Sequence, residues 1–166
     1  MTSTESARRT QLLTIYLNDH LTGATAGREL ARRLRRTFRN DPNEQTMVRI
    51  ADEIDDDRLT LVRLMRALDI KVSHIKPALG WFAEKLGRAK LNGRLLTRSP
   101  LSTLIELEIM RLGVEGKAAA WRTLHSICDR ETALDSNELQ QLIDRAEQQI
   151  VELEHLRKSS ATRIFG

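Results

Sequence analysis

The sequence has little of what stabilises small secreted proteins or β-sheet proteins. Its only cysteine is Cys128, so no disulfide can form within one chain, and a reducing compartment such as the cytoplasm is expected. Three prolines and 4% aromatic residues, beside abundant Leu, Arg, Glu and Ala, favour helix over strand. No apolar run approaches the roughly 20 residues of a membrane-spanning helix, and the start, MTSTESARRT, lacks the apolar core of a secretory signal. We therefore expect a cytoplasmic, all-α protein without a membrane span.

Turn-forming residues divide the 166-residue chain into helical segments, with breaks at NDPNE, IKP, LNGRLLTRSP and DRETALDSNE. The predicted long helices cover residues 5–38, 43–68, 100–128 and 136–162, and a short helix covers 77–91. The connection that holds the short helix can travel the height of a bundle of about 40 Å, so the second and third long helices should run parallel. The sequence predicts one domain over residues 1–166, a four-helix bundle with one long crossover.

Several charged residues fall on the apolar faces of these helices. At about 100° per residue, Asp19 lies within the apolar face of the first helix, His20 lies at its edge, and Asp57 lies on the apolar stripe of the second. A buried carboxylate costs several kcal/mol unless it is paired. We expect Arg111, whose planar group can serve two carboxylates, to neutralise Asp19 and Asp57. This predicted cluster, the polar core layer, comprises Asp19, His20, Glu53, Asp57, Glu108, Arg111 and Glu115.

Two glycines interrupt the first helix in the run GATAG. Glycine within a helix costs about 1 kcal/mol relative to alanine, so Gly23 and Gly27 should have a packing role. We expect the close approach of another helix, or space for a bulky aromatic side chain such as Trp81, Phe82 or Trp121.

The order of these motifs resembles that of the ferritin-like superfamily, in particular a bacterial branch that lacks the complete di-iron motif. The resemblance is carried by YLNDHLTGATAG, ADEIDDDRLTLVRLMRALDI, WFAEKLGRAKLNGRLLTRSPLS and IELEIMRLGVEGKAAAW. It implies a ferritin-like four-helix bundle, and metal-binding members hold two ions with Glu residues and two Glu-x-x-His motifs. Here only Glu152 and His155 have that spacing, and both are predicted to face solvent.

No catalytic signature is present: there is no glycine-rich phosphate loop, no zinc-type cysteine pairing and no activating partner for Cys128. We expect no catalytic residue, no metal and no cofactor. The leading hypothesis is therefore a metal-free, non-enzymatic scaffold or interaction module, with a homodimer or another protein as its partner.

Two alternatives stay open at this point. One is a variant carboxylate-bridged di-metal oxidoreductase that holds Fe or Mn with Asp19, His20, Glu53, Asp57 and Glu108. The other is a protein that binds nucleic acid or another polyanion, favoured by the net charge of +4. Its predicted basic patch comprises Arg32, Arg33, Arg35, Arg36, Lys85, Arg88 and Lys90.

Overall fold

The computed structural model describes residues 3–73 and 100–166. These residues form α1 (Ser3–Thr37), α2 (Glu44–Ala67), α4 (Pro100–His125) and α5 (Ser136–Phe165), and contain no strand. The four predicted long helices are confirmed to within a few residues at each end. The short helix predicted over 77–91 lies outside the described residues, as do Lys85, Arg88 and Lys90 of the predicted basic patch.

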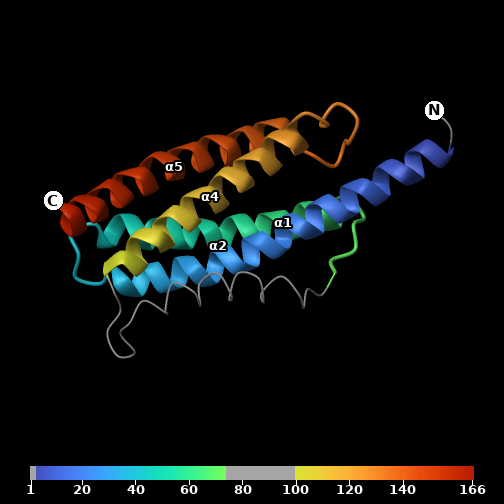
Figure 1. Ribbon diagram of the computed structural model, residues 1–166. Coiled ribbons are helices and arrows are strands. Elements are labelled where there is room, and N and C mark those ends of the chain that lie inside the picture. Colours follow the sequence, from blue (N-terminus) through green and yellow to red (C-terminus); the bar gives the residue numbers. More distant parts are fainter. Residues whose placement is uncertain (1–2, 74–99) are drawn as a thin grey trace.

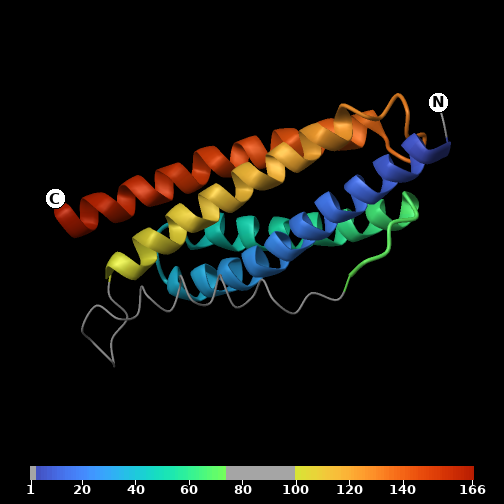
Figure 2. The same cartoon turned by 45° about the vertical axis from the view of Figure 1, so that its right-hand side comes forward.

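The four helices form two antiparallel pairs, α1 with α2 and α4 with α5 (Figure 1). α1 also packs on α4, whereas the backbones of α2 and α5 approach each other at only a few positions. α2 and α4 run in the same direction, as predicted, and lie on one diagonal of the bundle. α1 has 35 residues against 24 in α2, and its N-terminal turns extend past the end of α2 (Figure 2).

Short polar side chains fix the turns between paired helices. After α1, Asn40 adopts a left-handed conformation (φ 63°), which asparagine tolerates better than most residues. Asp41 then accepts a hydrogen bond of 2.9 Å from the backbone N–H of Asn43. Before α5, the carboxylate of Asp135 caps the helix by accepting from the backbone N–H groups of Asn137 and Glu138. These local bonds explain why the breaks fall where the sequence predicts them.

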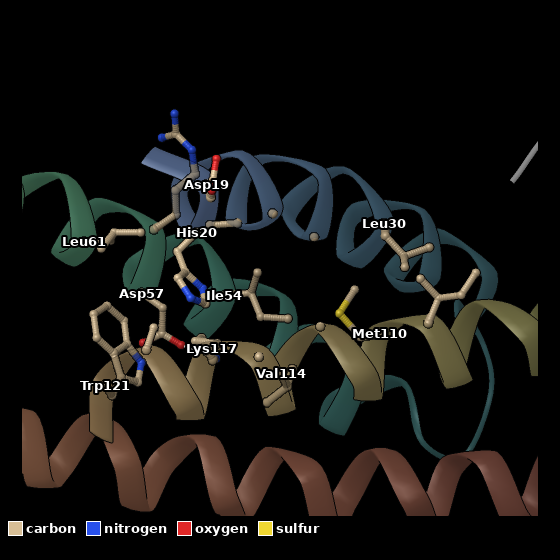
Figure 3. Close-up of a pocket in the computed structure, with 18 residues that line it drawn as sticks. Asp19, His20, Leu30, Ile54, Asp57, Leu61, Met110, Val114, Lys117 and Trp121 are labelled. Carbon is tan, nitrogen blue, oxygen red and sulfur yellow. Dashed lines mark hydrogen bonds and ion pairs between the residues drawn. The ribbon is translucent and has the colours of Figure 1, made fainter. Parts of the chain in front are cut away.

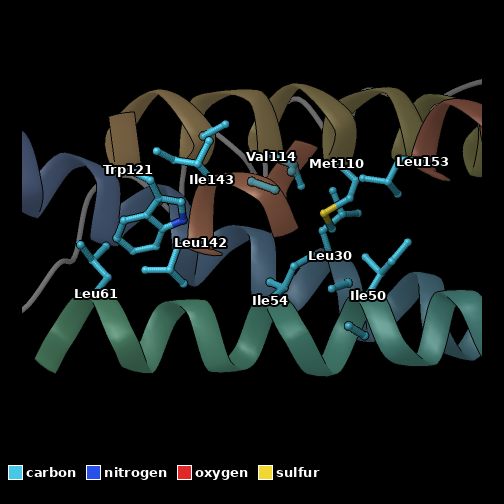
Figure 4. Close-up of a cluster of buried hydrophobic side chains, with 14 of the residues drawn as sticks. Leu30, Ile50, Ile54, Leu61, Met110, Val114, Trp121, Leu142, Ile143 and Leu153 are labelled. Atoms are coloured by element: carbon cyan, nitrogen blue, oxygen red, sulfur yellow. The ribbon is translucent and has the colours of Figure 1, made fainter. Parts of the chain in front are cut away.

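Aliphatic side chains from all four helices meet along the bundle axis (Figure 4). Trp121, on α4, is the largest buried side chain among the described residues and is 1% exposed. Around it pack Leu61 of α2 and Leu142 of α5. Burial of large side chains such as these stabilises the fold by about 1.5–3 kcal/mol each, and this apolar core surrounds the polar groups described next.

Candidate functional site

Asp57 is a buried carboxylate in the middle of α2, with 3% of its surface exposed. One of its oxygens accepts a hydrogen bond from the ammonium of Lys117 on α4, and the other accepts one from the guanidinium of Arg145 on α5. The burial of Asp57 confirms the sequence prediction. The predicted partner was wrong, because Arg111 does not contact Asp57.

The ion pair of Asp57 is one end of a continuous hydrogen-bonded chain. Lys117 also donates to the side-chain oxygen of Gln149, which is fully buried on α5. The amide of Gln149 donates to Glu53 over 2.7 Å, and Arg49 donates to the other oxygen of Glu53 over 2.9 Å. Arg49 also donates to Glu152. We call this set the ion chain; its members are Glu152, Arg49, Glu53, Gln149, Lys117, Asp57 and Arg145.

The ion chain is electrically balanced, since it contains three carboxylates and three cations. Burial lowers the pKa of Lys117, and the adjacent carboxylate of Asp57 opposes that shift. Hydrogen bonds to Glu152 and Glu53 raise the pKa of Arg49. The ion chain links α2 to α4 and to α5, two helices with which the backbone of α2 makes little or no direct contact.

Most of the predicted polar core layer does not lie in the core. Asp19 is exposed, and the side chains of Glu108 and Glu115 are 48% and 44% exposed. Arg111 is half-buried and lies 3.6 Å from both Glu115 and Glu154. Charged side chains of α4 pair instead with α5, since Glu108 lies 3.9 Å from Arg157 and Arg122 lies 2.7 Å from Glu147. Of the predicted carboxylates, only Asp57 and Glu53 belong to the ion chain.

His20 does not join the ion chain. It is half-buried, and its ring meets the ring of Tyr16 edge-to-face with centroids 4.5 Å apart. Burial lowers the pKa of His20, against the opposing effect of Asp19. The imidazole therefore favours its neutral form at pH 7.

Sequence reasoning missed Lys117 and Gln149, although their positions carried a signal. Lys117 is three residues after Val114 and four before Trp121, both buried on α4. Gln149 has the same spacing on the buried face of α5. A helix places residues three and four apart on one face, so both polar residues could have been assigned to the interior.

A cavity of about 220 Å³ lies beside the ion chain, between α1, α2 and α4 (Figure 3). We call it the glycine groove, because Gly23 and Gly27 of α1 and Gly113 and Gly116 of α4 line it. No described atom outside their own helix lies within 4 Å of a Cβ placed on any of these glycines. The sequence predicted that another helix approaches these glycines closely, and no described residue does so. Trp121, one of the aromatic residues predicted to occupy this space, lines the groove.

The inward carboxylates do not fit a metal site. Within residues 3–73 and 100–166, no three His, Cys, Asp or Glu side chains converge as metal ligands. The oxygens of Asp57 and Glu53 are already bonded to nitrogen donors. His155 is exposed as predicted, whereas Glu152 was wrongly predicted to face solvent and is half-buried against Arg49.

The α1 part of the predicted basic patch is largely neutralised by carboxylates. Arg32 lies 3.3 Å from Asp55, and Arg35 lies 2.8 Å from Asp52. Arg33 lies 3.4 Å from the buried carboxylate of Glu106. Arg36 is exposed. Acidic residues of α2 and α4 thus supply most of the counter-charge for this stretch of α1.

No helix in the described part of the chain is both long and apolar enough to cross a bilayer. Comparison of the sequence with protein-family models, with curated proteins and with solved structures finds no match in any of the three.

Proposed function

We propose that the protein is a ferritin-like bundle without a metal centre that acts as a scaffold or interaction module and not as an enzyme. The observation that carries this proposal is the pairing of Asp57, whose two oxygens accept hydrogen bonds from Lys117 and Arg145. In metal-binding bundles of this class, inward carboxylates bind ions. Here side chains supply the positive charge, and an ammonium and a guanidinium compete with any metal for the same oxygens.

The geometry gives less support to the two alternatives. A di-metal oxidoreductase would need Asp19 and Glu108 in the interior, and both are exposed. Polyanion binding would need free cations on α1, and Arg32 and Arg35 are paired with carboxylates of α2. Exposed ion pairs of this kind leave little net field at the surface.

For the partner, we propose a second copy of the chain that packs on the N-terminal part of α1. Leu12 and Ile15 are 58% and 53% exposed there, three residues apart on one face. The length difference between α1 and α2 extends α1 by roughly 16 Å at 1.5 Å per residue. Light scattering after size exclusion should report a dimer, and the double variant Leu12→Gln/Ile15→Gln should run as a monomer. A wild-type monomer at high concentration would exclude this arrangement.

The absence of a metal centre is tested on the purified chain. Elemental analysis should find well under one transition-metal ion per chain, and added Fe, Mn or Zn should leave the melting temperature unchanged. A bound metal would raise it according to RT ln(1 + [L]/Kd). Two stoichiometric metal ions, with a thermal shift that disappears in the Asp57→Asn variant, would overturn the proposal.

A further inference from the structure

The glycine groove is a largely apolar surface that no described residue covers (Figure 3). Gly23 on the α1 wall and Gly113 on the α4 wall are exposed, and Ile109 is half-buried. Leu112, next to Gly113 on α4, is 66% exposed. Contact between water and apolar surface is unfavourable, so an apolar segment that packs into the groove would be stabilised there.

Polar contacts between α1 and α4 fix the position of the groove along the bundle. Tyr16 donates a hydrogen bond to Thr123 over 3.1 Å, and Arg33 lies 3.4 Å from Glu106. These two contacts show that α1 and α4 are antiparallel. All four glycines of the groove lie between the two contacts.

Residues 74–99 join two points that lie on either side of the groove. Asn18 of α1 accepts a hydrogen bond of 2.7 Å from the backbone N–H of Ser73, so the chain leaves the described part beside α1, just before the groove begins. The chain re-enters it at Pro100, where α4 starts near the far end of α1 (Figures 1 and 2). This connection covers roughly 30 Å, the length of about 20 helical residues of α1. It therefore passes the level of all four glycines.

The side of the bundle between α1 and α4 is the apolar route for this connection. On the other side of α1, Arg28 and Arg32 both pair with Asp55 of α2, so charged side chains bridge α1 and α2 there. Over the same stretch, α1 and α4 present the walls of the glycine groove. An apolar segment that runs from α1 to α4 is thus better accommodated along the groove.

The sequence of the connection contains an apolar pattern that matches the groove. Leu79, Phe82 and Leu86 recur at intervals of three and four residues within the helix predicted over 77–91, which places them on one face of that helix. Trp81 falls on the opposite face of the same predicted helix. The pattern therefore predicts one apolar face that needs a partner.

Position and size both favour Phe82 as the residue that meets the glycines. A helix that begins at Pro77, soon after the contact of Ser73 with α1, reaches Phe82 near the level of the α1 glycines. A cavity of about 150 Å³ holds a benzene ring. The groove, at about 220 Å³, admits the phenyl ring of Phe82 and leaves room for one added methyl group on a glycine.

The net charge of the connection is opposite to that of the rest of the chain. Residues 74–99 contain six of the 27 Lys and Arg residues and one of the 23 Asp and Glu residues. The connection therefore carries +5, and the rest of the chain carries −1. Asp19, exposed on the rim of the groove, forms no ion pair with a described residue. Opposite charges favour contact between the connection and this face of the bundle.

We propose that residues 77–91 dock in the glycine groove through Leu79, Phe82 and Leu86, with the ring of Phe82 seated between the glycines of α1 and those of α4. The groove is then a contact surface for the chain's own connection and not for a second copy. This inference goes beyond the proposed function and does not rest on it, since docking requires neither the absence of a metal nor a dimer.

Hydrogen exchange of the full chain, measured by mass spectrometry on peptides from residues 77–91, tests whether the segment is docked. In the wild type these amides should exchange at least about tenfold more slowly than in an unstructured chain. Phe82→Gln should speed the exchange at least about fivefold, whereas Trp81→Gln, at the neighbouring aromatic residue on the opposite face, should change it less than about twofold. Unprotected amides in the wild type, or equal effects of the two variants, would overturn the proposal.

A second pair of variants tests the groove itself. Gly113→Leu fills the space of the phenyl ring, so the amides of residues 77–91 should again exchange at least about fivefold faster. Ala119→Leu is the matched control, because it enlarges an exposed residue of α4 that does not line the groove. Circular dichroism identifies a variant that has not folded, and Gly27→Leu then replaces Gly113→Leu on the opposite wall. Protection that persists in a folded glycine variant would show that the segment docks elsewhere.

Photocrosslinking identifies what occupies the groove. Replacement of Phe82 by p-azidophenylalanine should give crosslinks to the α1 or α4 peptides that line the groove, and the same replacement of Trp81 should not. A mixture of isotope-labelled and unlabelled chains separates crosslinks within one chain from crosslinks between two copies. Crosslinks within one chain to the groove support the proposal. Crosslinks between copies, or to peptides outside the groove, would overturn it.

Discussion

Lys117 on α4 donates a hydrogen bond to Asp57 on α2 across the interior of the bundle. The Lys117 side chain is 16% exposed and that of Asp57 is 3% exposed, so both charges are largely removed from water. α2 and α4 lie on a diagonal, and their backbones make no close contact within the described residues. This ion pair therefore adds a direct polar contact between two helices whose backbones do not approach each other. Removal of either partner leaves the other charge buried.

The Lys117→Met variant tests the cost of leaving Asp57 without its lysine. Breaking a buried pair by removing one partner destabilises a protein by about 3–5 kcal/mol. Arg145 still bonds to Asp57, so we expect a loss near 3 kcal/mol in urea unfolding. The control is Arg111→Met, which removes a half-exposed guanidinium and should cost less than about 1 kcal/mol. An equal loss of unfolding free energy in the two variants would contradict the placement of Lys117 in the core and of Arg111 at its edge.

Gln149 supplies the neutral link of the ion chain. Gln149→Leu preserves approximate volume but removes an acceptor from Lys117 and a donor from Glu53. An unsatisfied buried group costs about 1–3 kcal/mol, so the free energy of unfolding should fall by at least about 1 kcal/mol. Gln141→Leu, at an exposed position of the same helix, should change it by less than about 0.5 kcal/mol. A neutral effect of Gln149→Leu would show that these hydrogen bonds are not formed.

The ion pair between Glu154 and Arg157 should make the free energy of unfolding depend on pH in the acidic range. Hydrogen bonds from Arg157 at 2.9 Å lower the pKa of Glu154 from 4.5 to about 2. A carboxylate whose pKa is lowered in the folded state contributes stability above its unfolded pKa and loses it as pH falls through the folded pKa. That contribution is thus complete above pH 4.5 and disappears toward pH 2. Carboxyl ¹³C NMR titration measures this pKa directly; a midpoint at 4 or above would contradict the ion pair, and Arg157→Gln should raise the midpoint.

Alanine at the groove glycines should stabilise the fold. No described atom outside the helix lies within 4 Å of a Cβ at Gly23 or Gly113, and neither residue has positive φ. Helical glycine to alanine then gains about 0.5–1 kcal/mol. We expect Gly23→Ala and Gly113→Ala to raise the urea midpoint without changing the slope. Lower stability in both variants would mean that these positions are filled in solution.

The sequence predicted the helices well because their boundaries depend on local chemistry. The NDPNE turn and the cap at Asp135 act within a few residues, and apolar spacing identifies each buried face. The same spacing predicted correctly that Asp57 is buried.

The charge partners were not predictable in the same way. Sequence reasoning favoured Arg111 because a guanidinium can serve two carboxylates, yet Lys117 is the α4 residue that reaches Asp57. The spacing from Val114 and Trp121 does place Lys117 on the buried face of α4, but it does not show which side chain of another helix lies opposite. The long side chains of Lys117 and Arg145 also cross between helices, a distance that a helical wheel does not represent.

The most direct test of the central claim, that Lys117 is the counter-ion of Asp57 in the interior, is a double-mutant cycle with Asp57→Asn and Lys117→Met. Urea unfolding of the four proteins in metal-free buffer gives the coupling energy of the pair. We predict that the double variant is more stable than the sum of the single losses implies by at least about 1.5 kcal/mol, because residues in one buried network couple by 0.5–3 kcal/mol. Single losses that add to within about 0.5 kcal/mol, as for independent sites, would contradict the account.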